Sequence, residues 1–197
     1  MSALERRAQL IEVSRGIFAE RGFDAASIEE IAAAAKISKP VVYEHFGGKE
    51  GLYAEVLNEQ FADLRRTTEI KIMDADPLKK FELYVRATVA RYRKNPYLLR
   101  FYTSELTNPT PCFETIVKPA IMGVLSILQE TFTEGLTHEQ FREGLDPSDT
   151  VMALAGMINF YFLLEPASAE LVDHAQERDE ELIRHIMDIF TRGILKA

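Results

Sequence analysis

The stretch 37–49 constrains this chain most, because it predicts a very short helix between two strong boundaries. Ser38 can accept a hydrogen bond from a free amide of the first turn, and Pro40 lies in that turn, where its missing N–H is no loss. Gly47-Gly48 can adopt the positive φ angles that end a helix, so the helix should cover 39–46. A helix of two turns is not stable alone in water. It must therefore pack on neighbouring segments and leave its outer face open.

Two further helices are predicted before this stretch. Apolar side chains recur with the helical period over residues 4–21, and Gly22 is expected to end that helix. Ser27 and Glu30 form a capping-box pattern that leads into an alanine-rich helix ending near Ala35. Two helices joined by a short turn, the second short and cationic at its start, are typical of a helix-turn-helix. Such pairs also occur in proteins that never touch DNA.

The rest of the chain predicts helices separated by proline, asparagine and glycine, with no strand alternation and no internal repeat. The expected helical ranges are 49 to about 73, 78–94, a short helix after Pro96 through Leu106, a helix after Pro111 to about 134, 148–164 and 177–196. The predicted fold class is therefore all-α, with about nine helices. We expect a helix-turn-helix domain over residues 1–48 and a second helical domain over residues 49–197.

The charge of the chain limits how it could bind nucleic acid. A net charge of −8 argues against a broad nucleic-acid surface. Residues 1–53, however, contain seven Lys and Arg against eight Asp and Glu, so a small local DNA site remains possible there.

The longest apolar run, 151–164, is shorter than the roughly 20 residues of a membrane span, and no secretory signal opens the chain. We therefore expect a cytoplasmic protein without a membrane segment. Its single cysteine, Cys112, is expected to be a packed residue, and a reactive sensor thiol is the alternative.

The last two predicted helices carry more apolar surface than one core-facing stripe requires. One stripe of the final helix comprises Leu182, Ile186, Ile189 and Gly193, and the adjoining stripe comprises Ile183, Met187, Phe190 and Ile194. Two stripes indicate burial on two sides, although the pattern leaves open which one faces a partner. We predict a two-fold dimer through a four-helix bundle of these helices; a larger monomeric core is the alternative. The predicted interface comprises Met152, Gly156, Asn159, Leu163, Leu182, Ile186, Ile189 and Gly193.

Together these residues resemble the DNA-binding domain of TetR-family transcriptional regulators. The resemblance covers roughly residues 8–55. It is carried by Gly22-Phe23, Ser27-Ile28, Ile31-Ala32, Ile37-Ser38-Lys39, Tyr43, His45-Phe46 and Lys49-Glu50 with Leu52. The remaining sequence resembles the family only in its layout, a helical ligand-binding and dimerisation domain whose sequence varies between members.

The resemblance implies roles for individual residues of the helix-turn-helix. Ser27 would bind a phosphate with its hydroxyl and the first amides of its helix. Lys39 would reach a guanine edge and Pro40 a thymine methyl at the start of the recognition helix. Tyr43 and His45 match phosphate contacts, although packing among the three helices would also explain them. The predicted DNA-binding residues are Ser27, Ser38, Lys39, Pro40, Tyr43, His45 and Lys49.

The resemblance also implies a mechanism. A dimer would bind a palindromic operator, and a small molecule in the second domain would change the spacing of the recognition helices and release the DNA. The coupling needed is on the order of 1–3 kcal/mol. We expect a repressor, while activation would use the same parts with the opposite preference. The effector should be mainly apolar, because aromatic side chains and a methionine from several helices could line one cavity, although each could also be plain core. They are Phe81, Tyr84, Tyr92, Phe101, Tyr102, Phe113, Met122 and Phe132.

Two other classes of protein are alternatives. An all-α enzyme lacks support, since the sequence has no nucleophile elbow, phosphate loop or metal-ligand pair at a useful spacing. Glu181 and His185 are four residues apart, but a solvated helix pair explains them. We therefore predict no catalytic residue, cofactor or metal. A protein-binding adaptor would keep the helix-turn-helix as structure only and would leave Lys39, Tyr43 and Lys49 without a purpose.

Overall fold

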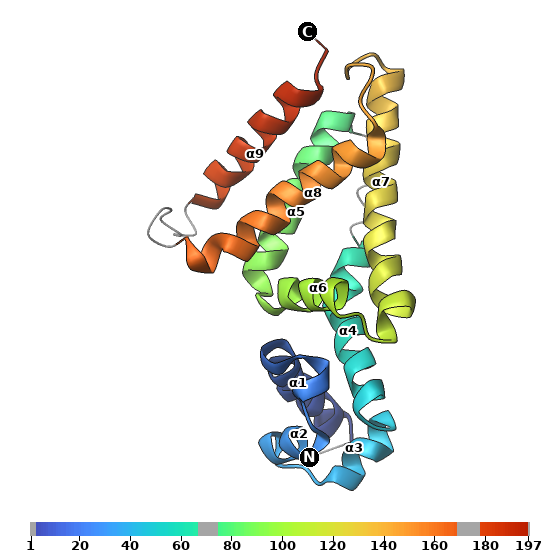
Figure 1. Cartoon of the computed structure of the whole chain (residues 1–197), viewed down its shortest axis with the longest axis vertical. Helices are drawn as coiled ribbons and strands as arrows, with labels where there is room; N and C mark the ends of the chain where they lie inside the picture. Colours follow the sequence, from blue (N-terminus) through green and yellow to red (C-terminus); the bar gives the residue numbers. More distant parts are fainter. Residues whose placement is uncertain (1–2, 67–74, 169–177, 197) are drawn as a thin grey trace. The chain divides into compact units, whose positions relative to one another are not determined.

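All regular structure in the described part of this chain is helical, apart from one isolated bridge between Phe141 and Leu195. The computed structural model describes residues 3–66, 75–168 and 178–196 (Figure 1). Nine α-helices lie in these ranges, which confirms the predicted all-α class. Two compact units are present. Unit 1 comprises Met1–Asp63 and Arg100–Ala120, and unit 2 comprises Leu64–Leu99 and Ile121–Ala197. Unit 1 thus contains the whole predicted helix-turn-helix together with a segment from later in the chain.

The first two helices end at residues with special backbone angles. Helix α1 (Ala3–Ala25) is broken at Gly22, the predicted stop, whose φ of 77° and ψ of 171° are not helical. Beyond this break the helical segment continues to Ala25. Helix α2 (Ile28–Ala35) begins as predicted, because the hydroxyl of Ser27 accepts a hydrogen bond from Glu30 N at 3.1 Å. It ends at Lys36, which has a φ of 54°.

Helix α3 (Lys39–Phe46) has the predicted bounds, but its start differs in one respect. The side chain of Ser38 makes no capping hydrogen bond, so the expected cap is wrong; its backbone carbonyl instead accepts from Val41 N at 3.1 Å. Gly47 and Gly48, with φ of 72° and 138°, end the helix. Helix α4 (Lys49–Arg66) follows at once. Its predicted continuation to about residue 73 lies outside the described residues.

The three helices of the helix-turn-helix pack in sequence, α1 on α2 and α2 on α3. Val42 is the one fully buried residue of helix α3. Val41, His45 and Phe46 are half-buried, and the other four residues of the helix are exposed. Tyr53 of α4 completes the core of this part, since its ring centroid lies 4.9 Å from those of both Phe18 and Phe23. The aromatic contacts hold α4 against α1.

The later helices start close to the predicted positions. They are α5 (Pro77–Lys94), α6 (Tyr97–Thr107), the π-helical turn η2 (Phe113–Val117), α7 (Lys118–Thr137), α8 (Pro147–Leu164), the 3-10 turn η3 (Glu165–Ala167) and α9 (Asp179–Ile194). Asp76 caps α5 by accepting from the amides of Leu78 and Lys79, and Asp146 caps α8 by accepting from Asp149 N. The last helix ends at Ile194 instead of 196, and residue 177, its predicted start, lies outside the described residues.

Within unit 2, α8 and α9 both pack against α5 (Figure 1). An aromatic cluster joins α5, α7 and α9 through Phe141, which comes from the segment between α7 and α8. Its ring centroid lies 5.2 Å from that of Phe132 and 6.1 Å from that of Phe81, and Phe81 in turn lies 5.1 Å from Phe190. All four rings are buried, so they form core packing.

Candidate DNA-binding and effector sites

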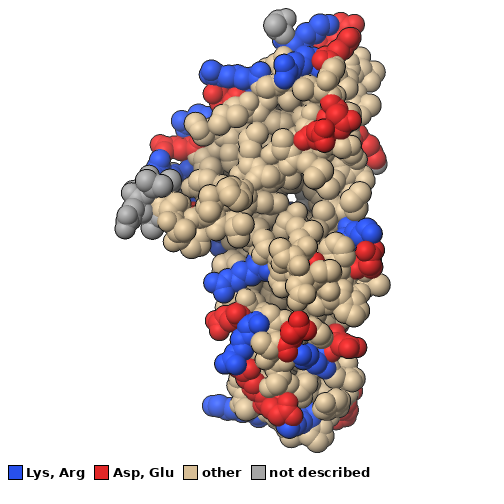
Figure 2. All heavy atoms as spheres, viewed as in Figure 1, with Lys and Arg blue, Asp and Glu red and all other residues tan. Residues whose placement is uncertain are grey.

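The outer face of α3 carries the strongest candidate for a DNA-binding site. Ser38, Lys39, Pro40 and Tyr43 are exposed, and the side chain of Tyr43 is 56% accessible despite its size. On the face that Figure 2 shows, acidic and basic side chains are interspersed where α1 to α3 lie. The exposed side chains near the start of α3 are therefore the candidates for DNA contact.

Lys39 is not unpaired in this state. Its ammonium group forms an ion pair with the carboxylate of Glu29 in α2, and the hydrogen bond from Lys39 holds the pKa of Glu29 below its usual range. Both side chains are largely exposed, and exposed ion pairs contribute little to stability. The pair can therefore open at small cost when another acceptor, such as a guanine edge, is offered.

Three other predicted DNA-binding residues have partners within unit 1. The Ser27 hydroxyl caps α2, and the half-buried His45 ring lies 6.1 Å from that of Phe46. The ammonium group of Lys49 donates to three backbone carbonyls at the end of the α1 segment and lies 4.4 Å from the ring centroid of Phe23. The acceptors are Phe23 O at 2.8 Å, Asp24 O at 3.2 Å and Ala26 O at 3.1 Å. Sequence reasoning missed this role because backbone carbonyls leave no signature in residue types.

The eight predicted effector contacts are divided between the two units. Phe101, Tyr102 and Phe113 belong to unit 1, and Phe81, Tyr84, Tyr92, Met122 and Phe132 belong to unit 2. Phe101 is buried with its ring 6.1 Å from that of Tyr53, whereas Met122 lies on the surface of α7. On α5, Tyr84 and Tyr92 flank Thr88, whose buried hydroxyl has no hydrogen-bond partner among the described residues. On this face of α5, predicted contacts thus adjoin an unsatisfied polar group.

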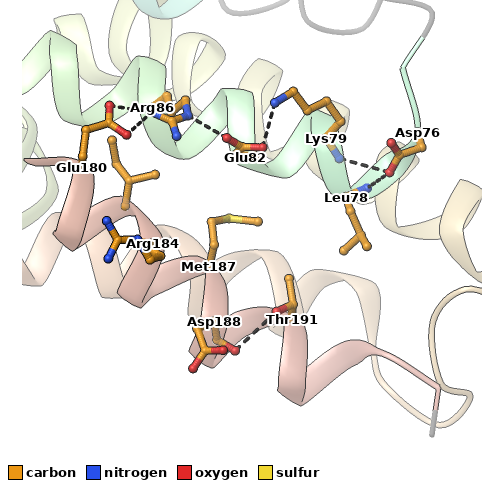
Figure 3. A pocket seen from close by; sticks show the side chains of 11 residues that line it. Asp76, Leu78, Lys79, Glu82, Arg86, Glu180, Arg184, Met187, Asp188 and Thr191 are labelled. Atoms are coloured by element: carbon orange, nitrogen blue, oxygen red, sulfur yellow. Dashed lines mark hydrogen bonds and ion pairs between the residues drawn. The ribbon is translucent and has the colours of Figure 1, made fainter.

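A groove of about 590 Å³ lies between α5 and α9 in unit 2 (Figure 3). Its lining residues are Asp76, Leu78, Lys79, Glu82, Arg86, Glu180, Ile183, Arg184, Met187, Asp188 and Thr191. Along one edge the charges alternate and are paired: Lys79 with Glu82 at 2.8 Å, then Arg86 with Glu82 at 2.7 Å and with Glu180 at 2.6 Å. None of the eight predicted effector contacts lines this groove. A ligand there would have to displace ion pairs that the protein already satisfies.

The predicted dimer residues of α8 mostly lie on the surface. Met152, Gly156 and Leu163 are exposed, whereas the Asn159 side chain accepts a hydrogen bond of 2.6 Å from the Tyr92 hydroxyl of α5. Sequence reasoning missed Phe160, whose side chain is 59% exposed on the same helix. In Figure 2 the surface over α8 is mostly uncharged.

Helix α9 buries a stripe that combines the two predicted ones. Ile183, Ile186, Phe190 and Ile194 face the core of unit 2. Ile186 is only 5% exposed and so belongs to its own chain's core, and Leu182 is half-buried. Ile189 and Gly193 are exposed and remain available to a partner.

Helix α8 is unusually apolar for a helix that is only partly covered. The segment Pro147–Ala167 has a mean hydropathy of 1.3 and, by length and composition alone, could cross a membrane, with 28% of its most apolar window buried. One stripe, Val151, Leu154, Ile158 and Phe162, packs within unit 2. On the opposite face Met152, Phe160 and Leu163 are exposed among the described residues.

Comparisons with known proteins agree with this description. Residues 10–56 match the family model described as "Bacterial regulatory proteins, tetR family". The HTH-type transcriptional repressor DhaR of Mycobacterium sp. (strain GP1) is 30% identical over 143 residues, which cover 72% of this chain and 72% of DhaR. The ketosteroid transcriptional regulator KstR2 of Mycobacterium tuberculosis superposes with a TM-score of 0.80 over 98% of this chain and 96% of KstR2, at 22% identity. AibR, solved in complex with isovaleryl coenzyme A and operator DNA, gives a TM-score of 0.76 over 93% of this chain and 97% of AibR, at 16% identity.

Proposed function

Because the chain belongs to the TetR family of transcriptional regulators, we propose that it is a repressor that binds a palindromic operator as a homodimer and releases it when a small effector occupies unit 2. The observation that carries the DNA-binding part is the outer face of α3. Lys39, Pro40 and Tyr43 are exposed on α3, the second helix of the helix-turn-helix. In helix-turn-helix proteins this second helix enters the major groove. Lys39 would read a base edge and Tyr43 would bind a phosphate.

The proposed homodimer is supported by the uncovered apolar face of unit 2. Met152, Phe160 and Leu163 of α8 are exposed together with Ile189 of α9, and Gly156 has open space around its Cα. A second copy would cover these residues and form a four-helix bundle. Two copies would also place two α3 helices on two half-sites, which multiplies a small local contact.

The proposed effector is small and mainly apolar, with a polar group that meets the Thr88 hydroxyl. Support comes from the buried, unpartnered hydroxyl of Thr88 between Tyr84 and Tyr92 on α5. AibR was solved with isovaleryl coenzyme A, whose acyl group is small and apolar although its coenzyme A part is polar and charged. Acyl coenzyme A thioesters therefore test whether an apolar group that carries a large polar extension acts as the effector. Isovaleryl coenzyme A should release a bound duplex and coenzyme A should not; no difference between them would direct the search to another ligand class.

The first test of the function is selection of random duplex DNA by the purified protein, followed by sequencing of the enriched pool. We expect a palindromic motif, whose two halves report the two recognition helices. The Lys39→Ala variant should enrich a pool with a relaxed preference at one position of each half-site. Absence of any enrichment at low and moderate salt would contradict the proposal.

We assign no catalytic role to this chain and place it in the cytoplasm, where a regulator meets bacterial DNA.

The sign of regulation is tested separately, by a reporter promoter that carries the selected motif in cells with and without the protein. Higher reporter output without the protein would support repression. Lower output without it would assign an activator with the same DNA-binding site.

A further inference from the structure

Glu105 in the last turn of α6 is a carboxylate with no exposed surface. It accepts a hydrogen bond of 2.7 Å from the Tyr53 hydroxyl and further bonds from Thr110, through its backbone amide at 3.2 Å and its hydroxyl at 3.0 Å. Burial, and then the bond to Glu105, raise the pKa of Tyr53, so the phenol stays protonated and acts as the donor. Every donor is neutral, and Glu105 forms no ion pair within the described part of the chain.

A buried carboxylate at this position is unfavourable on two grounds. It lies near the negative end of the α6 dipole, where a cation would be preferred. It also loses its hydration without gaining an opposite charge, and a well-packed apolar residue of similar volume is often at least as stable. The hydrogen bonds offset these costs only while all of them are present, because each lost partner leaves a buried charge less satisfied. The cluster should therefore form and break as a unit.

The cluster joins the end of α6 to the first and fourth helices. Tyr53, which holds Glu105, packs its ring on Phe18 and Phe23 of the α1 segment. The turn that follows α6 adds a second link, since the Asn108 amide donates to the Asp24 carboxylate at 3.1 Å. These contacts account for the membership of residues 100–120 in the unit that carries the helix-turn-helix.

We propose that Glu105 is a positioning residue, and that the Tyr53–Glu105–Thr110 cluster, here termed the clamp, keeps α1 and α4 in the arrangement that binds DNA. Opening the clamp lowers DNA affinity without unfolding the protein. This inference rests on the proposed function, because it assumes that α3 contacts DNA.

The position of the clamp in the chain supports this role. Only Gly47 and Gly48 separate α3 from α4, so the orientation of the recognition helix depends on how α4 is held. Helix α6 begins with residues of unit 2, up to Leu99, and ends in the clamp. The clamp is thus built on two of the described helices that contain residues of both units, α4 and α6.

The test is a double-mutant cycle with Tyr53→Phe and Glu105→Gln. Tyr53→Phe keeps the ring contacts and removes the donor, and Glu105→Gln keeps the volume but turns one acceptor into a donor. Affinity is measured for the selected palindromic duplex at a temperature at which circular dichroism shows every variant folded. Each single variant should bind about 5- to 50-fold more weakly, and the double variant should be within about twofold of the weaker one, because both changes break the same unit.

Glu114→Gln is the matched control, since it removes one carboxylate from an exposed position of the same unit. Its affinity should stay within about twofold of wild type, which separates the clamp from a general effect of charge on DNA binding. A purely structural role for Glu105 would lower the melting temperature and leave the affinity of the folded variants unchanged. Unchanged or tighter binding, or multiplicative losses in the double variant, would overturn the proposal.

Hydrogen exchange without DNA tests the clamp even if the proposed function fails. In Tyr53→Phe and Glu105→Gln the amides of α1, α4 and residues 100–113 should exchange at least about tenfold faster, and those of α5 and α9 should not change. If wild type enriches no duplex, the DNA-binding function fails while this measurement still decides whether the clamp holds α1 and α4. Unchanged exchange in α1 and α4 would overturn the clamp whatever the DNA result.

Discussion

The ammonium group of Lys39, the first residue of the recognition helix α3, is ion-paired with the carboxylate of Glu29 in α2. A base contact by Lys39 requires this pair to open. If Lys39 binds a base edge as proposed, Glu29 and DNA compete for the same cation, and this competition can be measured.

Glu29→Gln should raise DNA affinity about two- to fivefold, because Lys39 no longer has to leave a carboxylate before it binds a base. The measurement is titration of the selected duplex at fixed salt. Glu12→Gln is the matched control, since Glu12 is similarly exposed and is paired with Arg15 outside α3. Equal gains in both variants would point to general charge repulsion and would remove the special role of the Lys39 pair.

Lys49→Met should lower the free energy of unfolding by about 1–3 kcal/mol, because three carbonyls at the end of the α1 segment lose a charged donor. Methionine keeps much of the side-chain length, and urea unfolding reports the loss. Lys118→Met, at an exposed lysine of the same unit, should change stability by less than about 0.5 kcal/mol. A Lys49→Met variant of unchanged stability that binds all duplexes more weakly would instead favour the phosphate contact expected from the sequence.

Met152→Arg should convert dimers to monomers, because it places a charge in the apolar face of α8 that a second copy would cover. Sedimentation velocity gives the result directly. Met122→Arg is the control and should leave the dimer intact, since Met122 is a comparably exposed methionine on α7, 50% accessible against 60% for Met152. A dimer that survives Met152→Arg would place the interface elsewhere. Ile186 is unsuitable for this test because it is buried in its own chain.

Arg93→Ala should destabilise the protein by about 1–3 kcal/mol, a value reduced from that of a fully buried pair because the site is partly exposed. Arg93 pairs with both Glu165 and Asp179 and lies 4.8 Å from the ring centroid of Phe162. Arg86→Ala is the comparison. The Arg86 side chain is 40% exposed, against 22% for Arg93, so this substitution should lower the free energy of unfolding by less than about 1 kcal/mol. Equal losses in urea unfolding would contradict this ranking.

Local sequence patterns determined the helices and their ends, because caps and glycine stops act within about four residues. Ser27, Asp76 and Asp146 begin helices as their residue types predict, and Gly47-Gly48 ends α3. The exposed face of α3 follows for the same reason: a two-turn helix that is held mainly by one buried residue, Val42, leaves its opposite side exposed. The all-α class and the helix-turn-helix with its family resemblance were therefore readable from the chain.

Tertiary structure alone decided which groups meet across distance. Helical periodicity defines the apolar face of a helix but does not identify the segment that packs against it. The buried stripe of α9 could therefore not be assigned, and the sequence left open whether Phe81 lines a cavity or packs in the core, where it meets Phe141. Lys49 reaches carbonyls more than twenty residues earlier, and Glu105 meets Tyr53 across 52 residues. A backbone carbonyl is present at every residue, so residue types do not show which one accepts a hydrogen bond. Likewise, the residue type of a glutamate does not show whether its carboxylate is buried in the folded chain.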